Sequence, residues 1–392
     1  MDVEGPIVTR RRQSPRVPPL AFVLSDPSAP RLNDLHLPMP RAHLLILVVL
    51  LAAGLALGWN KGRLPERPIE PATSGEARTA PDLRLYREVV DEVRRGNDYY
   101  QVARQKIPQF GFPITSPLNW RLPTYAWVLA LLPDRCSRQA ALLGLSLVSL
   151  VLAFYAQRRT SPTSIAAASV FLLFGVVRWA FDGEAYLAQE PWAATLIVIS
   201  LSAHALGGRW RALAVACGTA ALLFRELALP YCGVACLCAA WNRRWWESAA
   251  WAAGIALFFC FFAWHVGQVR GQLAGSETTA ASAGLAQWLR FGGLDFVLLT
   301  TRMNGLLFAA PAGLLWLYLL AALWGLAQRC DETSRLACLA ALAYVSAFAI
   351  VGRSENFYWG LLPAPLLAWG AAHAAERLIT SIRPPQPLVA VG

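Results

Sequence analysis

The feature that most constrains the fold is a series of long apolar segments that recur along most of the chain. A helix needs about 20 predominantly apolar residues to cross a bilayer core of about 30 Å. The region 212–241 contains two such segments, or else a single broken hairpin. The segments therefore predict an all-α polytopic membrane protein with about ten transmembrane helices, at 43–59, 138–155, 164–181, 191–206, 212–224, 227–241, 249–266, 306–326, 336–351 and 358–375.

Composition excludes a water-soluble protein. Of the 392 residues, 56% are hydrophobic and only 15% are charged, and the mean hydropathy is +0.42. A soluble domain of this length is far less apolar. The formal net charge of +11 comes almost wholly from arginine, since Lys61 and Lys106 are the lysines. On a membrane protein such an excess marks cytoplasmic loops, so we expect no nucleic-acid partner.

The eight cysteines predict neither disulfides nor a metal centre. Most lie inside apolar segments, where a free thiol packs as a small hydrophobic group. Cys232, Cys236 and Cys238 lack paired CxxC elements and nearby histidines. We therefore expect no zinc site.

Charged loops predict the orientation of the chain. Basic loops alternate with other loops, and cytoplasmic loops carry the arginine excess. Both termini are then cytoplasmic, with a basic, proline-rich, disordered tail at 1–42, a membrane domain at 43–378 and a second tail at 379–392. The loops at 60–133, 182–190, 225–226, 267–304 and 352–357 fall on the opposite, extracytoplasmic side.

The first extracytoplasmic segment, 60–133, is long enough to fold. Pro81 and Asp82 favour a helix start, and Gly96 favours a stop. Tyr86, with the valines that follow it, recurs at helical spacing, which predicts an amphipathic helix along the membrane surface. The same spacing puts Asp82 on the face of Tyr86. Residues 124–133 are apolar but too short to span, and they predict a re-entrant or interfacial helix.

A set of short motifs carries a family resemblance. The motifs are Asp82, Tyr86, Gly96, Asp98, Tyr99 and Tyr100, then Arg121-Leu122-Pro123, and later the segments 224–230 and 353–359. In this pattern the chain resembles the GT-C class of polyprenyl-phosphate-sugar-dependent glycosyltransferases, and most of all its bacterial mannosyltransferase-like branch. It departs from the class in two respects: Asp82 lies about twenty residues beyond the first expected span, farther than is usual for the catalytic acid, and no adjacent acidic pair stands beside it.

The resemblance implies transfer of a sugar, most often mannose in that branch, from a polyprenyl-phosphate donor to an extracytoplasmic glycan, lipid or protein, with inversion. The protein would lie in the bacterial inner (plasma) membrane. Such a reaction needs a carboxylate base and cations for the departing phosphate. Whether the reaction also needs a divalent metal is left open by the resemblance. The expected residues are Asp82 and then Asp98 for the base, Arg225, Glu226 and Arg353 for the phosphate or donor, and Tyr86, Tyr100, Trp120, Glu355 and Tyr358 for the acceptor or sugar.

Simpler readings compete with these assignments. Asp82 also fits a helix cap, Arg225 and Glu226 also fit a structural ion pair, and the aromatic residues also fit an interfacial belt. Asp182, Glu184 and Glu190 could hold sugar hydroxyls or orient the arginines, but they also fit solvated loop acids. Two other functions remain open: a secondary transporter, and a polymerase or ligase of envelope polysaccharides. A transporter, however, usually shows internal repeats and charges deep within several spans.

Overall fold

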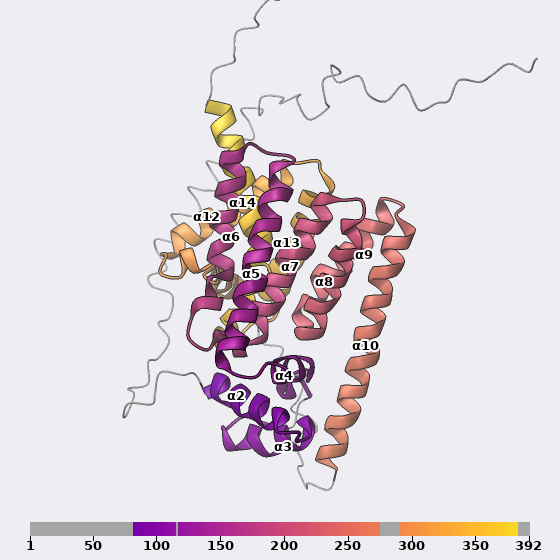
Figure 1. The fold of residues 1–392 in the computed structure, drawn as a ribbon. Coiled ribbons are helices and arrows are strands. Elements are labelled where there is room, and N and C mark those ends of the chain that lie inside the picture. The colour runs from indigo at the N-terminus through magenta and orange to yellow at the C-terminus, as the bar shows by residue number, and fades with distance from the viewer. Residues whose placement is uncertain (1–80, 115–116, 275–290, 383–392) are drawn as a thin grey trace, which may run out of the picture.

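The computed structural model describes residues 81–114, 117–274 and 291–382, and within these ranges all regular structure is helical. Figure 1 shows a bundle of long, roughly aligned helices with a layer of short helices across one end. We call this layer the cap layer, and the opposite end of the bundle the far end. The cap layer comprises α2 (Pro81–Arg94), α3 (Tyr99–Gln109), η3 (Pro117–Trp120) and α4 (Thr124–Ala130).

The predicted spans within the described residues correspond to helices. They are α5 (Arg135–Arg158), α6 (Thr163–Val177), α7 (Gln189–Leu206), α8 (Trp210–Phe224), α9 (Leu229–Trp241), α10 (Trp245–Leu273), α12 (Ala312–Ala327), α13 (Glu332–Ile350) and α14 (Ala364–Ile382). The first expected span, 43–59, lies outside the described residues.

Length and composition separate these helices into groups. Four of the described helical stretches are long and apolar enough to cross a membrane: α5, α6 with the following turn η4 (Arg178–Phe181), α10 and α13. Helices α8, α9 and α12 are apolar but shorter. The polytopic all-α fold is thus confirmed, whereas the exact number of spans remains a prediction.

Helix α7 is the centre of the bundle, since almost all of its side chains are buried, including the polar Gln189 and Glu190 in its first turn. It packs most extensively against α5 and α8. A polar residue on such a helix is held among neighbours instead of facing lipid.

Close packing of α12 on α14 depends on two glycines. A Cβ atom on Gly370 would lie 2.2 Å from the carbonyl oxygen of Ala322, and one on Gly325 would lie 2.1 Å from the carbonyl oxygen of Gly370. Small residues let the backbones of two membrane helices approach in this way.

The cap layer has a core of its own, in which Tyr86, Val89 and Val90 of α2 pack with the aromatic residues Trp120 and Tyr125. The predicted helix is confirmed: α2 begins at Pro81, and Gly96 follows it with φ of +92°, a conformation that glycine adopts without strain. The short helix expected at 124–133 is α4.

The sequence did not predict every described helix: α3 (Tyr99–Gln109) and a short helix in a later loop were both missed. The stretch 267–304, expected to be a loop, contains α11 (Gly293–Thr301), which packs against α13 and against η8 (Ser354–Leu361). Its nine residues bury Phe296 and Val297. A segment this short carries no hydrophobic periodicity that separates it from an apolar loop.

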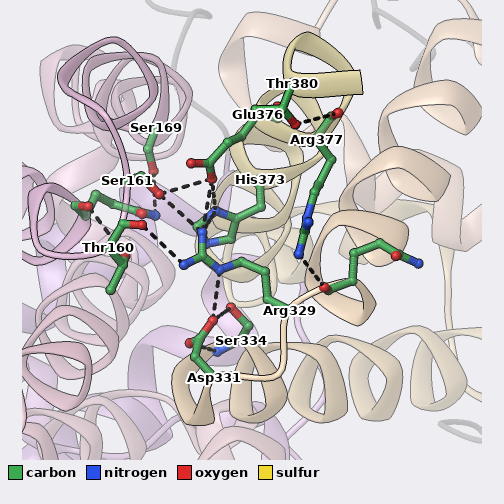
Figure 2. A network of polar contacts seen from close by, with 12 residues as sticks. Thr160, Ser161, Ser169, Arg329, Asp331, Ser334, His373, Glu376, Arg377 and Thr380 are labelled. Carbon is green, nitrogen blue, oxygen red and sulfur yellow. Dashed lines mark hydrogen bonds and ion pairs between the residues drawn. The ribbon is translucent and has the colours of Figure 1, made fainter. Parts of the chain in front are cut away.

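The far end is held together by buried polar networks. Figure 2 shows one of them around Arg329, in the connection between α12 and α13. Its guanidinium lies 2.9 Å from a carboxylate oxygen of Asp331 and 3.0 Å from one of Glu376, and it also contacts Ser161 and His373. The network therefore joins the α5–α6 connection, the α12–α13 connection and α14.

Candidate functional site

The candidate site begins at the break between α8 and α9. Helix α8 ends at Phe224, and Arg225 takes an extended backbone conformation with φ −146° and ψ 114°. The short turn η6 (Glu226–Ala228) follows and leads into α9. The break turns Arg225 inward, so that its side chain is only 1% exposed.

Two carboxylates surround this buried arginine. Nε of Arg225 lies 2.8 Å from Oε1 of Glu190, and Nη1 donates a hydrogen bond of 2.5 Å to Oε1 of Glu226. The pair with Glu190 is close but lacks the alignment of a hydrogen bond. The side chain of Glu190 is 3% exposed and that of Glu226 is 23% exposed. The positive charge of Arg225 is therefore balanced within the protein, and Glu226 is the member of the trio that reaches solvent.

A second arginine comes from the cap layer. Arg121 follows η3 and has φ of +52°, an uncommon conformation for a residue with a side chain. Its Nε donates to the hydroxyl of Tyr86 at 3.0 Å, and its Nη2 donates to the hydroxyl of Tyr358 at 3.2 Å. Tyr86 lies on α2 and Tyr358 on η8, so the guanidinium joins the first cap helix to the segment that precedes the last helix of the bundle.

Electrostatic interactions link Arg121 to the two carboxylates that pair with Arg225. Burial lowers the pKa of Arg121, but the phenols of Tyr86 and Tyr358 and the carboxylates of Glu190 and Glu226 raise it by more, so the pKa lies well above its ordinary value. Arg121 is therefore a permanent cation within range of both carboxylates. We call Tyr86, Arg121, Glu190, Arg225, Glu226 and Tyr358 the arginine site.

Burial also raises the pKa of Tyr86 to about 12; Arg121 opposes this shift, whereas Tyr358, Glu190 and Asp82 add to it. The phenol is consequently neutral at physiological pH and acts as a hydrogen-bonding group. The interaction with Asp82 puts that carboxylate at the edge of the arginine site. Asp82 itself is partly exposed in the first turn of α2, where Oδ1 accepts a hydrogen bond of 3.0 Å from the backbone N–H of Leu83.

The second expected base, Asp98, has a structural position. It is exposed and caps α3, and its Oδ1 accepts a hydrogen bond of 3.0 Å from the backbone N–H of Gln101. This bond satisfies one of the free N–H groups of the helix start.

Two of the expected aromatic contacts lie inside the protein. Tyr100 is 3% exposed, and its hydroxyl lies 3.0 Å from Nδ1 of His265 on α10. Trp120 is 1% exposed, and its indole N–H donates to the carbonyl of Ile114 at 2.8 Å. Both side chains pack in the core of the cap layer, whereas Tyr358 lies in the arginine site.

Arg353 and Glu355 lie before and within η8, on the same side of the bundle as the cap layer. Nη1 of Arg353 is 3.9 Å from Oε1 of Glu355, whose side chain is 62% exposed. The pair is therefore at the rim, and Tyr358 is the part of this segment that reaches the arginine site.

Sequence reasoning gave too little weight to two residues of the site. Arg121 was noted only as part of a motif. Glu190 was given a secondary role, orienting the arginines or holding sugar hydroxyls, with a solvated acid as the favoured alternative, although it is 2% exposed. The available signal for Glu190 was its place directly before Pro191, which puts an acid in the first turn of an apolar helix. For Arg121 the signal was a basic residue between buried Trp120 and Leu122.

Comparison with known proteins identifies a structural neighbour. No protein-family model matches the chain, and no curated protein matches it. The crystal structure of ArnT from Cupriavidus metallidurans bound to undecaprenyl phosphate aligns with 86% of this chain at a TM-score of 0.50 and 15% sequence identity. The same protein in its apo state aligns with a TM-score of 0.44. The chain spans 62% of the length of the ligand-bound ArnT chain.

At this identity the likeness describes the fold. The all-helical, GT-C-like architecture expected from the motifs is thereby confirmed. The chain is accordingly an integral membrane protein with a helical bundle and a helical cap layer of that type.

Proposed function

We propose that the chain is a membrane glycosyltransferase that moves a sugar from a polyprenyl-phosphate donor to a hydroxyl group of an acceptor at the cap-layer end of the bundle. The observation that carries the proposal is the arginine site, where Arg121 of the cap layer lies within electrostatic range of the two carboxylates that hold Arg225 of the bundle. The structural neighbour that shares the fold was crystallised with undecaprenyl phosphate, which supports the choice of donor lipid.

Arg121 is the cation that contacts the donor phosphate in this proposal. Its described hydrogen-bond partners are two tyrosine hydroxyls, so its charge is not cancelled by a direct ion pair among the described residues. Two further features suit it: guanidinium matches phosphate oxygens in geometry, and a charge held in a partly buried site is worth more than one in water.

Arg225 and Glu226 form the second part of the donor site. Because two carboxylates, Glu190 and Glu226, face its one positive charge, Arg225 adds a directed set of N–H donors and no net positive charge. The exposed part of Glu226 is placed to accept hydrogen bonds from hydroxyl groups of the donor sugar. Arg353 extends the donor site at its rim, and Glu355 together with Tyr358 lines the side from which the acceptor approaches.

Asp82 is the proposed base. Inversion requires the acceptor oxygen to attack C1 of the sugar from the face opposite to the departing phosphate, so the base and the arginines should flank the sugar on two sides. Asp82 interacts with Tyr86, whereas Arg225 is held by Glu190 and Glu226, which suits this arrangement. Asp82 takes the acceptor proton as the C1–O bond to phosphate breaks, and the electron pair of that bond leaves with the polyprenyl phosphate near Arg121.

The test is transfer of labelled sugar in membranes that contain the full chain and are supplied with polyprenyl-phosphate-mannose or polyprenyl-phosphate-glucose. We expect Asp82→Asn and Arg121→Gln to lose at least a hundredfold in rate at matched expression. Glu92→Gln is the matched control, because Glu92 lies on the same helix and pairs with Arg95 and Asn97, away from the site. Wild type that transfers neither sugar, or Asp82→Asn that transfers normally, contradicts the proposal.

A further inference from the structure

The far end of the bundle has an arrangement of charge that the proposed reaction does not use. Four side chains form a network where α8, α10 and α13 begin. Glu247 is 0% exposed and accepts from Arg211 at 2.9 Å and from Arg244 at 2.6 Å. Glu332 accepts from Arg211 at 3.0 Å and also pairs with Arg244. Two guanidiniums thus meet two carboxylates, and the network is electrically balanced.

Three more arginines surround this network and have no carboxylate partner among the described residues. Arg209 lies two residues before Arg211, Arg243 directly precedes Arg244, and Arg335 is one helical turn after Glu332. All three are exposed. Arg335 also lies within electrostatic range of Cys238 on α9, which places it beside the α9–α10 connection. Because the nearby carboxylates of Glu247 and Glu332 already pair with Arg211 and Arg244, the positive charges of these three arginines are uncompensated.

The backbone at the α9–α10 connection presents one of these charges outward. Arg243 has φ of +56°, one of two such non-glycine residues within the described chain; the other is Arg121. A residue with a side chain adopts this conformation at an energetic cost, and such residues tend to cluster at functional positions.

Exposed indoles flank the same connection. Trp241 is 81% exposed, Trp245 is 67% exposed and Trp246 is 57% exposed. Tryptophan on a membrane protein lies at headgroup depth, with its ring among the first carbons of the lipid chains. Figure 1 shows the α9–α10 connection at the opposite end of the bundle from the cap layer. The three indoles therefore set this connection at one membrane surface, and the three arginines at the level of the lipid phosphates.

We propose that Arg209, Arg243 and Arg335, with the flanking tryptophans, form a binding site for the headgroup of an anionic phospholipid in the leaflet at the far end. The charge is uncompensated, it is fixed on three helix starts by the balanced network beneath it, and the neighbouring aromatic rings suit acyl chains. Arginines between membrane helices bind anionic headgroups in this way. The site is separate from the arginine site and does not depend on the proposed reaction.

The test is lipid binding by the purified full-length chain in a mild detergent, followed by native mass spectrometry. The probes are phosphatidylglycerol and phosphatidylcholine with identical acyl chains. We expect wild type to retain phosphatidylglycerol preferentially, and Arg243→Gln to bind it about fivefold more weakly, which corresponds to about 1 kcal/mol for one arginine at an anionic surface. The triple variant, with Arg209→Gln and Arg335→Gln added, should show no preference between the two lipids.

Arg84→Gln is the matched control, since Arg84 is an exposed arginine on α2 at the opposite end of the bundle. Unchanged melting temperatures in detergent alone would show that the variants fold. The proposal is overturned if Arg243→Gln binds phosphatidylglycerol as wild type does, or if Arg84→Gln loses as much binding. It is also overturned if millimolar inorganic phosphate displaces the lipid completely, because the site would then recognise free phosphate.

Discussion

Arg121 and Tyr358 are 237 residues apart in the chain, and the guanidinium of the first donates a hydrogen bond of 3.2 Å to the hydroxyl of the second. The same guanidinium holds Tyr86 at 3.0 Å. The orientation of the guanidinium thus depends on the hydroxyl groups of two tyrosines that lie far apart in the chain.

For the proposed transfer reaction we therefore expect Tyr358→Phe and Tyr86→Phe each to raise the KM for the proposed lipid-phosphate donor by about tenfold, with a smaller change in kcat. A hydrogen bond to a charged group contributes about 1.5 to 3 kcal/mol, and Arg121 without its partner samples orientations that miss the phosphate. Tyr231→Phe is the control, because its hydroxyl bonds to Ser200 in the bundle core at 2.9 Å. A rise in KM for Tyr231→Phe equal to that for Tyr358→Phe would point to general loosening of the protein.

The two acids that hold Arg225 should differ in their effect on stability. Glu190→Ala leaves a buried guanidinium short of one partner, and breaking a buried pair costs about 3 to 5 kcal/mol. Glu226→Ala should cost less, since water reaches the place of its side chain, which is 23% exposed. Melting temperatures of the purified variants in detergent show which substitution destabilises the protein more. A larger fall in melting temperature for Glu226→Ala than for Glu190→Ala would contradict the prediction.

The contact between Tyr100 and His265 should couple the cap layer to α10. The hydroxyl and the ring nitrogen lie 3.0 Å apart, and both side chains are buried. We expect the double-mutant cycle of Tyr100→Phe and His265→Phe to give a coupling energy of about 1 kcal/mol. Limited proteolysis after α3 should accelerate in either single variant. If the two substitutions change the free energy of unfolding in a strictly additive way, the contact makes no contribution to stability.

Asp331 should give the far end a pH-dependent stability. Burial raises the pKa of Asp331, but hydrogen bonds from Ser334 and the guanidinium of Arg329 lower it by more, so the pKa is below its ordinary value. A depressed pKa means that the folded protein binds fewer protons than the unfolded chain, and the stabilisation is present above the unfolded pKa of about 3.9 and lost as the pH falls below it.

The variant Asp331→Asn should therefore lower the melting temperature most at pH 7, and the difference from wild type should shrink as the pH approaches 3. Thermal unfolding of both proteins in the same detergent over this range measures it. A difference that stays constant from pH 7 to pH 3 would show that the charge of Asp331 is not the source of the stabilisation.

Packing of α12 on α14 gives a final prediction. Gly370→Val should destabilise the protein, because its Cβ would meet the carbonyl oxygen of Ala322 at 2.2 Å and the two backbones would have to separate. Gly144→Val is the control, since a Cβ on Gly144 of α5 meets nothing within 4 Å. Equal melting temperatures for the Gly370 variant and wild type would contradict the close approach.

The sequence by itself determined the elements of the membrane fold. Apolar length fixed the helices, because a backbone in lipid must satisfy its hydrogen bonds within the segment, and a period of 3.6 residues fixed α2. It also placed the break at Arg225, because a charged pair interrupts an apolar run there. The resemblance of short motifs then brought in the GT-C-like architecture that the fold confirms.

Only the tertiary structure decided which polar residues meet. Arg121 and Glu190 look alike in sequence to many loop charges, and their neighbours come from distant segments, so no local pattern reports them. Local pattern also does not separate Asp82 from Asp98, Tyr100 and Trp120, which share its motif region. In the structure Asp98 caps a helix, and Tyr100 and Trp120 lie in the core of the cap layer. Sequence sets which side chains are available at an end of the bundle. The packing of helices far apart in the chain sets their distances, and distance governs electrostatics and hydrogen bonding.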